Sequence, residues 1–89
     1  MPKAEISWKR VTGDGKKLQV NAQHVGREWK FFHRERRFDI WQSVPEPPLE
    51  DWLELLDAVR RLITRRRYQP VDEERLLRKI RERFPEAGV

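Results

Sequence analysis

The stretch LQVNAQHVGREWKFFHR, residues 18–34, decides the fold that this sequence predicts. Its polar side chains alternate with apolar ones, which are Leu18, Val20, Ala22, Trp29 and Phe31. Strict alternation over a few residues is typical of a half-buried strand, and only Val25-Gly26 separates the two alternating halves. Because so short a connection forces a hairpin, the stretch predicts two antiparallel strands at about 16–24 and 27–34.

The same alternation continues on both sides of this hairpin. It predicts a strand at about 5–11, around Trp8, and another at about 37–42, around Ile40. The separators are short and rich in turn-forming residues, as in Gly13-Asp14-Gly15. The four strands are therefore expected to form an antiparallel β-meander.

Turn length predicts which residues lie opposite one another. A three-residue loop between the first two strands places Trp8 opposite Val20. Two-residue turns then place Val20 opposite Phe31, and Phe31 opposite Ile40. In this register one face of the sheet collects the apolar side chains, which are Ile6, Trp8, Leu18, Val20, Ala22, Trp29, Phe31, Phe38 and Ile40.

The rest of the chain has the pattern of two helices. Three prolines in 43–48 predict a stiff connector inside the domain. Apolar residues then recur at three- and four-residue spacing through about 48–66 and about 71–84, where Pro85 ends the pattern. A sheet with one apolar face and two amphipathic helices predicts an α+β fold, with the helices covering that face. The length of 89 residues predicts a single domain, 1–89.

The composition narrows the class of function. The chain has no cysteine, so a disulfide framework and a thiolate metal site are both excluded. No apolar run approaches the ~20 residues of a membrane span. His24 and His33 lie far apart on the predicted sheet, and Gly13-Asp14-Gly15 joins two strands rather than opening a helix as a phosphate loop does. We expect a cytoplasmic protein that is not an enzyme, uses no metal or other cofactor and does not enter a membrane.

The net charge of +5 is unevenly distributed. The first 44 residues carry ten Lys/Arg against five Asp/Glu, whereas the last 45 residues carry ten of each. The predicted strands therefore hold the whole positive excess, which suits a polyanionic partner.

An arginine tract closes the first predicted helix, and two interpretations of it stay open. Its members are Arg60, Arg61, Arg65, Arg66 and Arg67. Cations near a helix C-terminus stabilise the helix dipole by about 0.3 to 1 kcal/mol each, which makes Arg60 and Arg61 structural. The remaining three are denser than the dipole requires, so they could hold a phosphate or an acidic partner.

The second face of the predicted sheet is basic and rich in amides. The register places Lys30 opposite Trp41, within reach of a cation–π contact. Cations supply affinity for phosphates, amides can bond base edges, and aromatic rings can stack on bases. With the end of the arginine tract, the predicted nucleic-acid contacts are Lys9, Lys17, Gln19, Asn21, Lys30, Phe32, Arg34, Arg37, Trp41, Arg65, Arg66 and Arg67.

These observations predict a small binding module that contacts nucleic acid mainly through phosphates. The alternative is a protein-interaction or homodimeric assembly module in which the basic helix ends are purely structural. An antiparallel sheet ordinarily has one polar face even where nothing binds there, so composition alone leaves both hypotheses open.

Overall fold

The computed structural model of the chain describes residues 4–26 and 28–89. Four antiparallel strands precede two helices, which confirms the predicted α+β fold. The chain divides into two compact units, a sheet unit (1–47) and a helical unit (48–89). We describe each unit by itself, and the grouping of both into one domain, with the helices over the sheet, stays a prediction.

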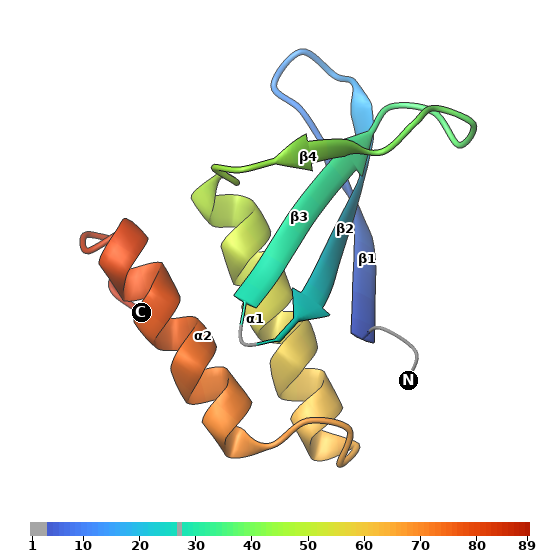
Figure 1. Cartoon of the computed structure of the whole chain (residues 1–89). Helices are drawn as coiled ribbons and strands as arrows, with labels where there is room; N and C mark the ends of the chain where they lie inside the picture. Colours follow the sequence, from blue (N-terminus) through green and yellow to red (C-terminus); the bar gives the residue numbers. More distant parts are fainter. Residues whose placement is uncertain (1–3, 27) are drawn as a thin grey trace. The chain divides into compact units, whose positions relative to one another are not determined.

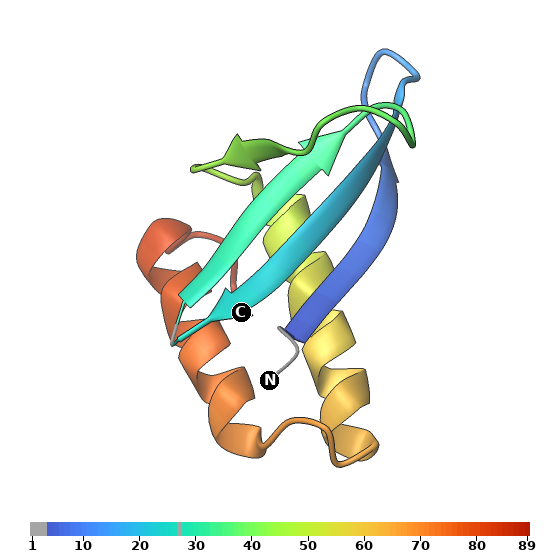
Figure 2. The same cartoon turned by 45° about the vertical axis from the view of Figure 1, so that its right-hand side comes forward.

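The sheet unit is a meander in which each strand pairs with its neighbours in sequence (Figure 1). Its strands are β1 (Ala4–Val11), β2 (Lys17–Val25), β3 (Glu28–Arg34) and β4 (Gln42–Val44). Figure 2 shows the three long strands side by side. The first three predicted strands are confirmed to within about a residue, although the predicted start of the third, Arg27, lies outside the described residues.

The pairing of β1 with β2 follows the predicted register, with Trp8 opposite Val20. The turn closes when the backbone N–H of Thr12 donates to the carbonyl oxygen of Lys16 at 2.8 Å. Gly15 has a φ of 86°, a left-handed conformation that glycine adopts without steric cost. Gly13-Asp14-Gly15 therefore forms the hairpin loop between β1 and β2, as predicted.

The predicted register between β2 and β3 is wrong by two residues. Val20 lies opposite His33, and Phe31 lies opposite Ala22. The ladder continues to Val25, which the sequence places in the turn, and Gly26 has a positive φ of 63°. A shift of two residues leaves every side chain on its predicted face, because side chains alternate with a period of two.

A fourth strand pairs with β3 as predicted, but its predicted bounds, 37–42, are wrong. Only Gln42–Val44 pairs with β3, which places Val44 rather than Ile40 opposite Phe31. Phe38 and Ile40 are 93% and 88% exposed, so neither joins the apolar face. The cause is a turn in the chain before β4.

This turn is closed by hydrogen bonds in both directions between Arg36 and Asp39. The Asp39 backbone N–H donates to the Arg36 carbonyl oxygen at 3.0 Å, and the Arg36 N–H donates to Asp39 Oδ2 at 3.1 Å. Aspartate side chains favour such turns because they bond nearby backbone in competition with a strand ladder. The apolar alternation of this segment therefore marks no strand.

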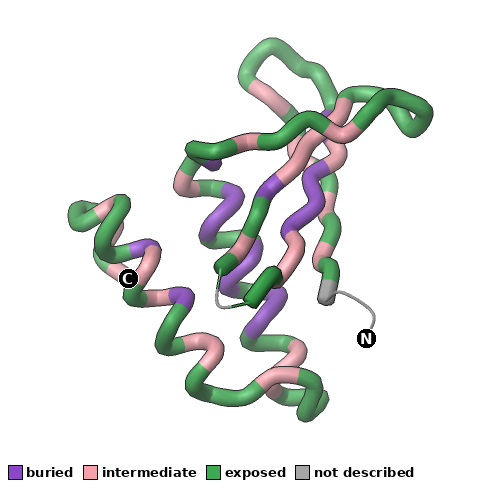
Figure 3. Tube along the Cα trace, viewed as in Figure 1, coloured by how far each residue is buried: buried purple, intermediate pink, exposed green. Residues whose placement is uncertain are grey.

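The apolar side of the sheet is buried along β2 and β3 (Figure 3), at Leu18, Val20, Ala22 and Phe31. The rings of Trp8 and Phe31 meet edge to face, with centroids 6.2 Å apart. Edge-to-face packing adds about 0.5 to 1.5 kcal/mol to the burial of such rings. The sheet therefore has one well-packed apolar face, as the alternation predicts.

The helical unit contains α1 (Leu49–Thr64) and α2 (Pro70–Arg83). Both helices have the predicted helical spacing of apolar residues, although Leu53, expected on the apolar stripe, is 37% exposed. The buried apolar residues are Trp52, Leu55, Leu56, Ala58 and Val59 in α1 and Leu76 and Ile80 in α2. A capping box between Gln69 and Asp72 satisfies backbone N–H groups where α2 begins. Arg60 of α1 and Glu73 of α2 form an ion pair at 2.6 Å. Arg60 thus acts as a link between the helices, in keeping with its predicted structural role.

Candidate nucleic-acid interface

The polar face of the sheet is built as rows of residues that lie opposite one another on β1, β2 and β3. We define it as the face carrying the odd-numbered residues of β1 and β2 and the even-numbered residues of β3. One row is Lys9, Gln19 and Arg34, and the next is Ser7, Asn21 and Phe32. A third row contains Glu5, Gln23 and Lys30. Predicted site residues from three strands therefore do come together.

Arg34 is the most constrained cation on this face. Its Nε donates a hydrogen bond to Gln19 Oε1 at 2.7 Å, and its Cζ lies 4.1 Å from the centroid of the Trp41 ring. The predicted contact of Lys30 with Trp41 is wrong, because the strand that was to carry Trp41 is a turn and loop. The two Nη groups of Arg34 make no hydrogen bond to any residue in 4–26 or 28–89. Stacking and one anchoring bond thus hold a guanidinium whose outer donors stay available.

A hollow of about 260 Å³ surrounds this guanidinium. Its lining residues are Ser7, Trp8, Lys9, Gln19, Arg34 and Trp41. The lining has two cations and no carboxylate, so the local charge favours an anionic ligand. We call this feature the Arg34 hollow.

The carboxylates of the polar face gather at one end, where Glu5 shares a row with Lys30 and Glu28 lies two residues before it on β3. Lys9, Lys17 and Lys30 are exposed, and none forms an ion pair with a carboxylate of the described residues. Lys17 of β2 lies in the row next to that of Arg34, on the side of the β1–β2 loop. Glu5 lies at the opposite end of the sheet, near the start of β1. The face is therefore most basic beside the Arg34 hollow. Arg37, also predicted in the site, lies in the exposed turn before β4 rather than on a strand.

Two of the predicted contacts, Asn21 and Phe32, lie in the least accessible row of this face. Asn21 is only 6% exposed, and its Nδ2 donates to Ser7 Oγ at 2.9 Å. Phe32 is half-buried beside it in the same row. The Asn21 side chain therefore ties β2 to β1, and Ser7 is a polar residue of this site that the sequence analysis did not select.

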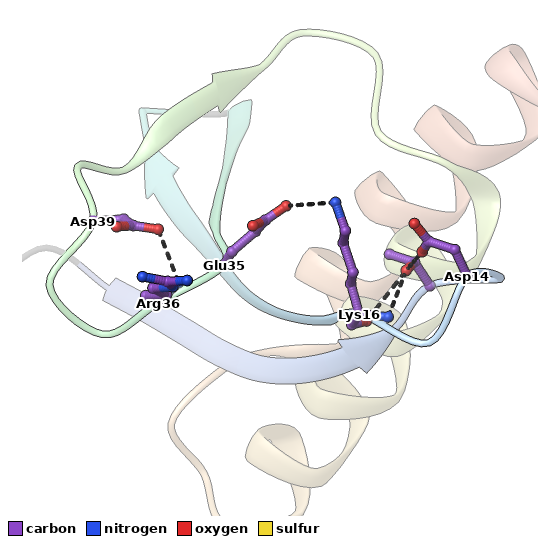
Figure 4. A network of polar contacts seen from close by, with 6 residues as sticks. Asp14, Lys16, Glu35, Arg36 and Asp39 are labelled. Atoms are coloured by element: carbon purple, nitrogen blue, oxygen red, sulfur yellow. Dashed lines mark hydrogen bonds and ion pairs between the residues drawn. The ribbon is translucent and has the colours of Figure 1, made fainter.

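Polar contacts order the loops at the cationic end of the sheet (Figure 4). Lys16 forms an ion pair with Glu35 at 3.7 Å, which joins the β1–β2 loop to the segment after β3. A hydrogen bond from the Thr12 hydroxyl to Asp14 lowers the pKa of that carboxyl. A hollow of about 830 Å³ lies among these loops, and its lining includes the exposed Phe38 and Ile40. Arg34 lines this hollow too, together with the carboxylates of Asp14, Glu35 and Asp39, so positive charge is compensated on this side of Arg34 and not in the Arg34 hollow.

Arg65, Arg66 and Arg67 lie beyond the end of α1, which stops at Thr64 rather than near the predicted residue 66. Arg66 has a φ of 60°, and its backbone N–H donates to the Ile63 carbonyl oxygen at 2.9 Å. The next N–H, of Arg67, donates to the Leu62 carbonyl oxygen at 2.9 Å. This pair of bonds is a Schellman motif, with an arginine at the position that usually holds glycine.

The three arginines are exposed and belong to the helical unit. Their backbone bonds end α1, which gives the tract a structural role whatever it binds. Arg61 forms an ion pair with Asp57 at 3.3 Å, an i,i+4 contact on the same helix.

The two histidines have different surroundings on the sheet. His24 stacks on Trp29 with ring centroids 4.4 Å apart and an interplanar angle of 8°. His33 is half-buried opposite Val20. Among residues 4–26 and 28–89, no three side chains of His, Cys, Asp or Glu gather as a metal site would require.

Comparisons with protein-family models, curated proteins and solved structures found no match to this chain. Neither helix of the described chain has the length and apolar character needed to cross a membrane.

Proposed function

We propose that this protein is a non-enzymatic binding module that holds nucleic acid on the polar face of its sheet, with backbone phosphates as the main contacts. The observation that carries the proposal is the geometry of Arg34. Gln19 fixes its Nε, Trp41 supports its plane, and its two Nη groups remain available. A guanidinium offers paired donors that match the oxygens of a phosphate.

The arrangement reduces the entropic cost of binding. A flexible arginine loses about 0.5 to 1.5 kcal/mol of side-chain freedom when a ligand immobilises it. The ring of Trp41 and the amide of Gln19 already restrict the side chain of Arg34. Much of its side-chain entropy is therefore lost when the protein folds, and less remains to be lost when a ligand binds. Lys9 lines the same hollow and can place a second positive charge beside the next phosphate of the chain.

The extent of the basic surface supports a polymer over a single small anion. Lys17 and Lys30 lie in rows on either side of the hollow, on β2 and β3. A chain of phosphates running along the strands could meet Lys17, then Lys9 and Arg34, and, beyond one row without a cation, Lys30. Other modules track a nucleic-acid backbone through a basic surface in this way. Base edges have few partners here, since Asn21 is buried, so weak sequence preference is expected.

Fluorescence anisotropy with labelled single- and double-stranded DNA and RNA at low salt tests this proposal. The double variant Lys9→Gln, Lys30→Gln removes two cations from the polar face. The matched control, Arg75→Gln with Arg78→Gln, removes two exposed cations from α2. The proposal expects weaker binding only in the first variant.

Two results would count against the proposal. Equal loss of affinity in the two double variants would show that net charge alone drives the binding. Equally strong displacement of the nucleic acid by polyglutamate would show that any polyanion suffices, and would favour an acidic protein as the partner.

A further inference from the structure

The outer edge of β1 is the longest unpaired strand edge in the described chain. The strand order places β1 and β4 at the two edges of the sheet, and β1 has eight residues against three in β4. An edge strand presents backbone N–H and C=O groups that can pair with another chain. In β4 the edge is short, and Pro45 follows it directly. β1 is therefore the edge at which the sheet could be extended.

The sequence of β1 is complementary to itself when two copies run antiparallel. With a two-fold axis at Ser7, Glu5 of one copy lies opposite Lys9 of the other, and the pair occurs twice. On the other face the same register places Ile6 opposite Trp8. Opposite charges and an apolar pair directly across two strands are the combinations that stabilise an antiparallel ladder.

Other registers lack this complementarity. A two-fold axis at Glu5 would put Glu5 opposite Glu5, and an axis at Lys9 would put Lys9 opposite Lys9. Parallel pairing in register would bring both like-charge pairs together. Lysine on an edge strand normally discourages pairing, but here the charges favour one register and oppose those that put like charges opposite each other.

We propose that the protein forms a two-fold homodimer by antiparallel pairing of β1 with β1 of a second copy, centred on Ser7. Half-buried Ile6 and Trp8 would each gain an apolar neighbour on one side of the new pair. On the other side the polar faces of the two copies would become continuous, in a sheet of twice as many strands. The dimer does not depend on the proposed nucleic-acid binding.

Cysteine cross-linking tests the register directly, because the natural chain has no cysteine. In a variant with Glu5→Cys and Lys9→Cys, each new thiol would face the other thiol of the second copy. The two thiols of one chain lie about 13 Å apart, four strand residues at ~3.3 Å each, whereas a disulfide needs Cα atoms within about 7 Å. The expected product on mild oxidation is a covalent dimer.

Each single cysteine variant is the matched control, since residue 5 of one copy lies about 13 Å along the strand from residue 5 of the other. The proposal expects no rapid cross-linking from either single variant. Equal cross-linking by Glu5→Cys alone would overturn the register, and a double variant that stays monomeric would overturn the dimer.

Charge reversal supplies a second test that does not need oxidation. Sedimentation equilibrium at low salt should show a dimer whose dissociation constant rises roughly ten- to thirtyfold on Glu5→Lys, because two attractive pairs become repulsive. The same increase is expected for Lys9→Glu. Combining both substitutions restores the opposite-charge pairs and should restore the dimer. A wild-type chain that sediments as a monomer at every concentration would overturn the proposal.

Discussion

Replacing Arg66 by glycine should stabilise the helical unit, although it removes a side chain from the most conspicuous tract of the sequence. Arg66 has a φ of 60° in the Schellman motif that ends α1. A residue with a β-carbon loses roughly 1 to 2 kcal/mol in this conformation. Glycine avoids that loss, but its freedom in the unfolded chain offsets about 0.5 to 1 kcal/mol of the gain.

The expected net gain is therefore about 0.5 to 1 kcal/mol, or roughly 2 to 8 °C in the thermal midpoint of a domain this small. Both hydrogen bonds of the motif use backbone atoms and persist in the variant. Thermal unfolding followed by circular dichroism at the helical band measures the change. Arg66→Ala is the control, because it removes the same charge and keeps the β-carbon.

The difference between the two variants isolates the backbone effect. If Arg66→Gly melts no higher than Arg66→Ala, the left-handed backbone at this position is not a source of strain. Arg65→Gly should destabilise the unit, since residue 65 has a φ of −89° and gains nothing from glycine.

Three further results are expected. Ile40→Ser should change the free energy of unfolding by less than about 0.5 kcal/mol, because Ile40 is exposed, whereas Phe31→Ala should lower it by about 3 to 5 kcal/mol. Denaturant titration measures both values, and equal losses would favour a fourth strand that buries Ile40. Trp41→Leu should weaken nucleic-acid binding at low salt without unfolding the sheet, because the guanidinium of Arg34 loses the ring on which it stacks. Unchanged affinity would show that the Trp41 ring does not contribute to the site. Thr12→Val should raise the pKa of Asp14 toward its ordinary value, as carboxyl NMR titration would show. Because the wild-type pKa is lowered, the hydrogen bond stabilises the fold at neutral pH, and this stabilisation is lost as the pH falls through the folded-state pKa of Asp14. An unchanged pKa in the variant would show that Thr12 is not the cause of the shift.

The parts of the fold that the sequence predicts correctly are those set by local geometry. The glycine-rich loop fixes the register of β1 on β2, and the spacing of apolar residues marks both helices. The fourth strand is not predictable from alternation, because Asp39 diverts the chain into a turn through hydrogen bonds that the apolar pattern does not reveal. The end of α1 is missed for a related reason, since the left-handed position holds Arg66 where glycine would have been the signal.

The candidate site is predicted in its composition and missed in its arrangement. The register error of two residues kept Gln19 and Arg34 on the same face but hid the fact that they lie directly opposite each other. With Trp41 expected on a strand, its contact with Arg34 could not be foreseen. Asn21 was selected for its amide, and its burial follows from neighbours across the sheet that no single-strand pattern specifies.

The most direct test of the proposed function is the salt dependence of binding to single-stranded nucleic acid. Contact of four phosphates with Lys9, Lys17, Lys30 and Arg34 predicts a log–log slope of roughly −3, and a loss of affinity of about fiftyfold between 50 and 200 mM salt. Removing Lys9 and Lys30 should reduce the slope to about half that value. A wild-type protein with no detectable binding at 50 mM salt, or a slope that these two substitutions leave unchanged, would contradict binding through the polar face.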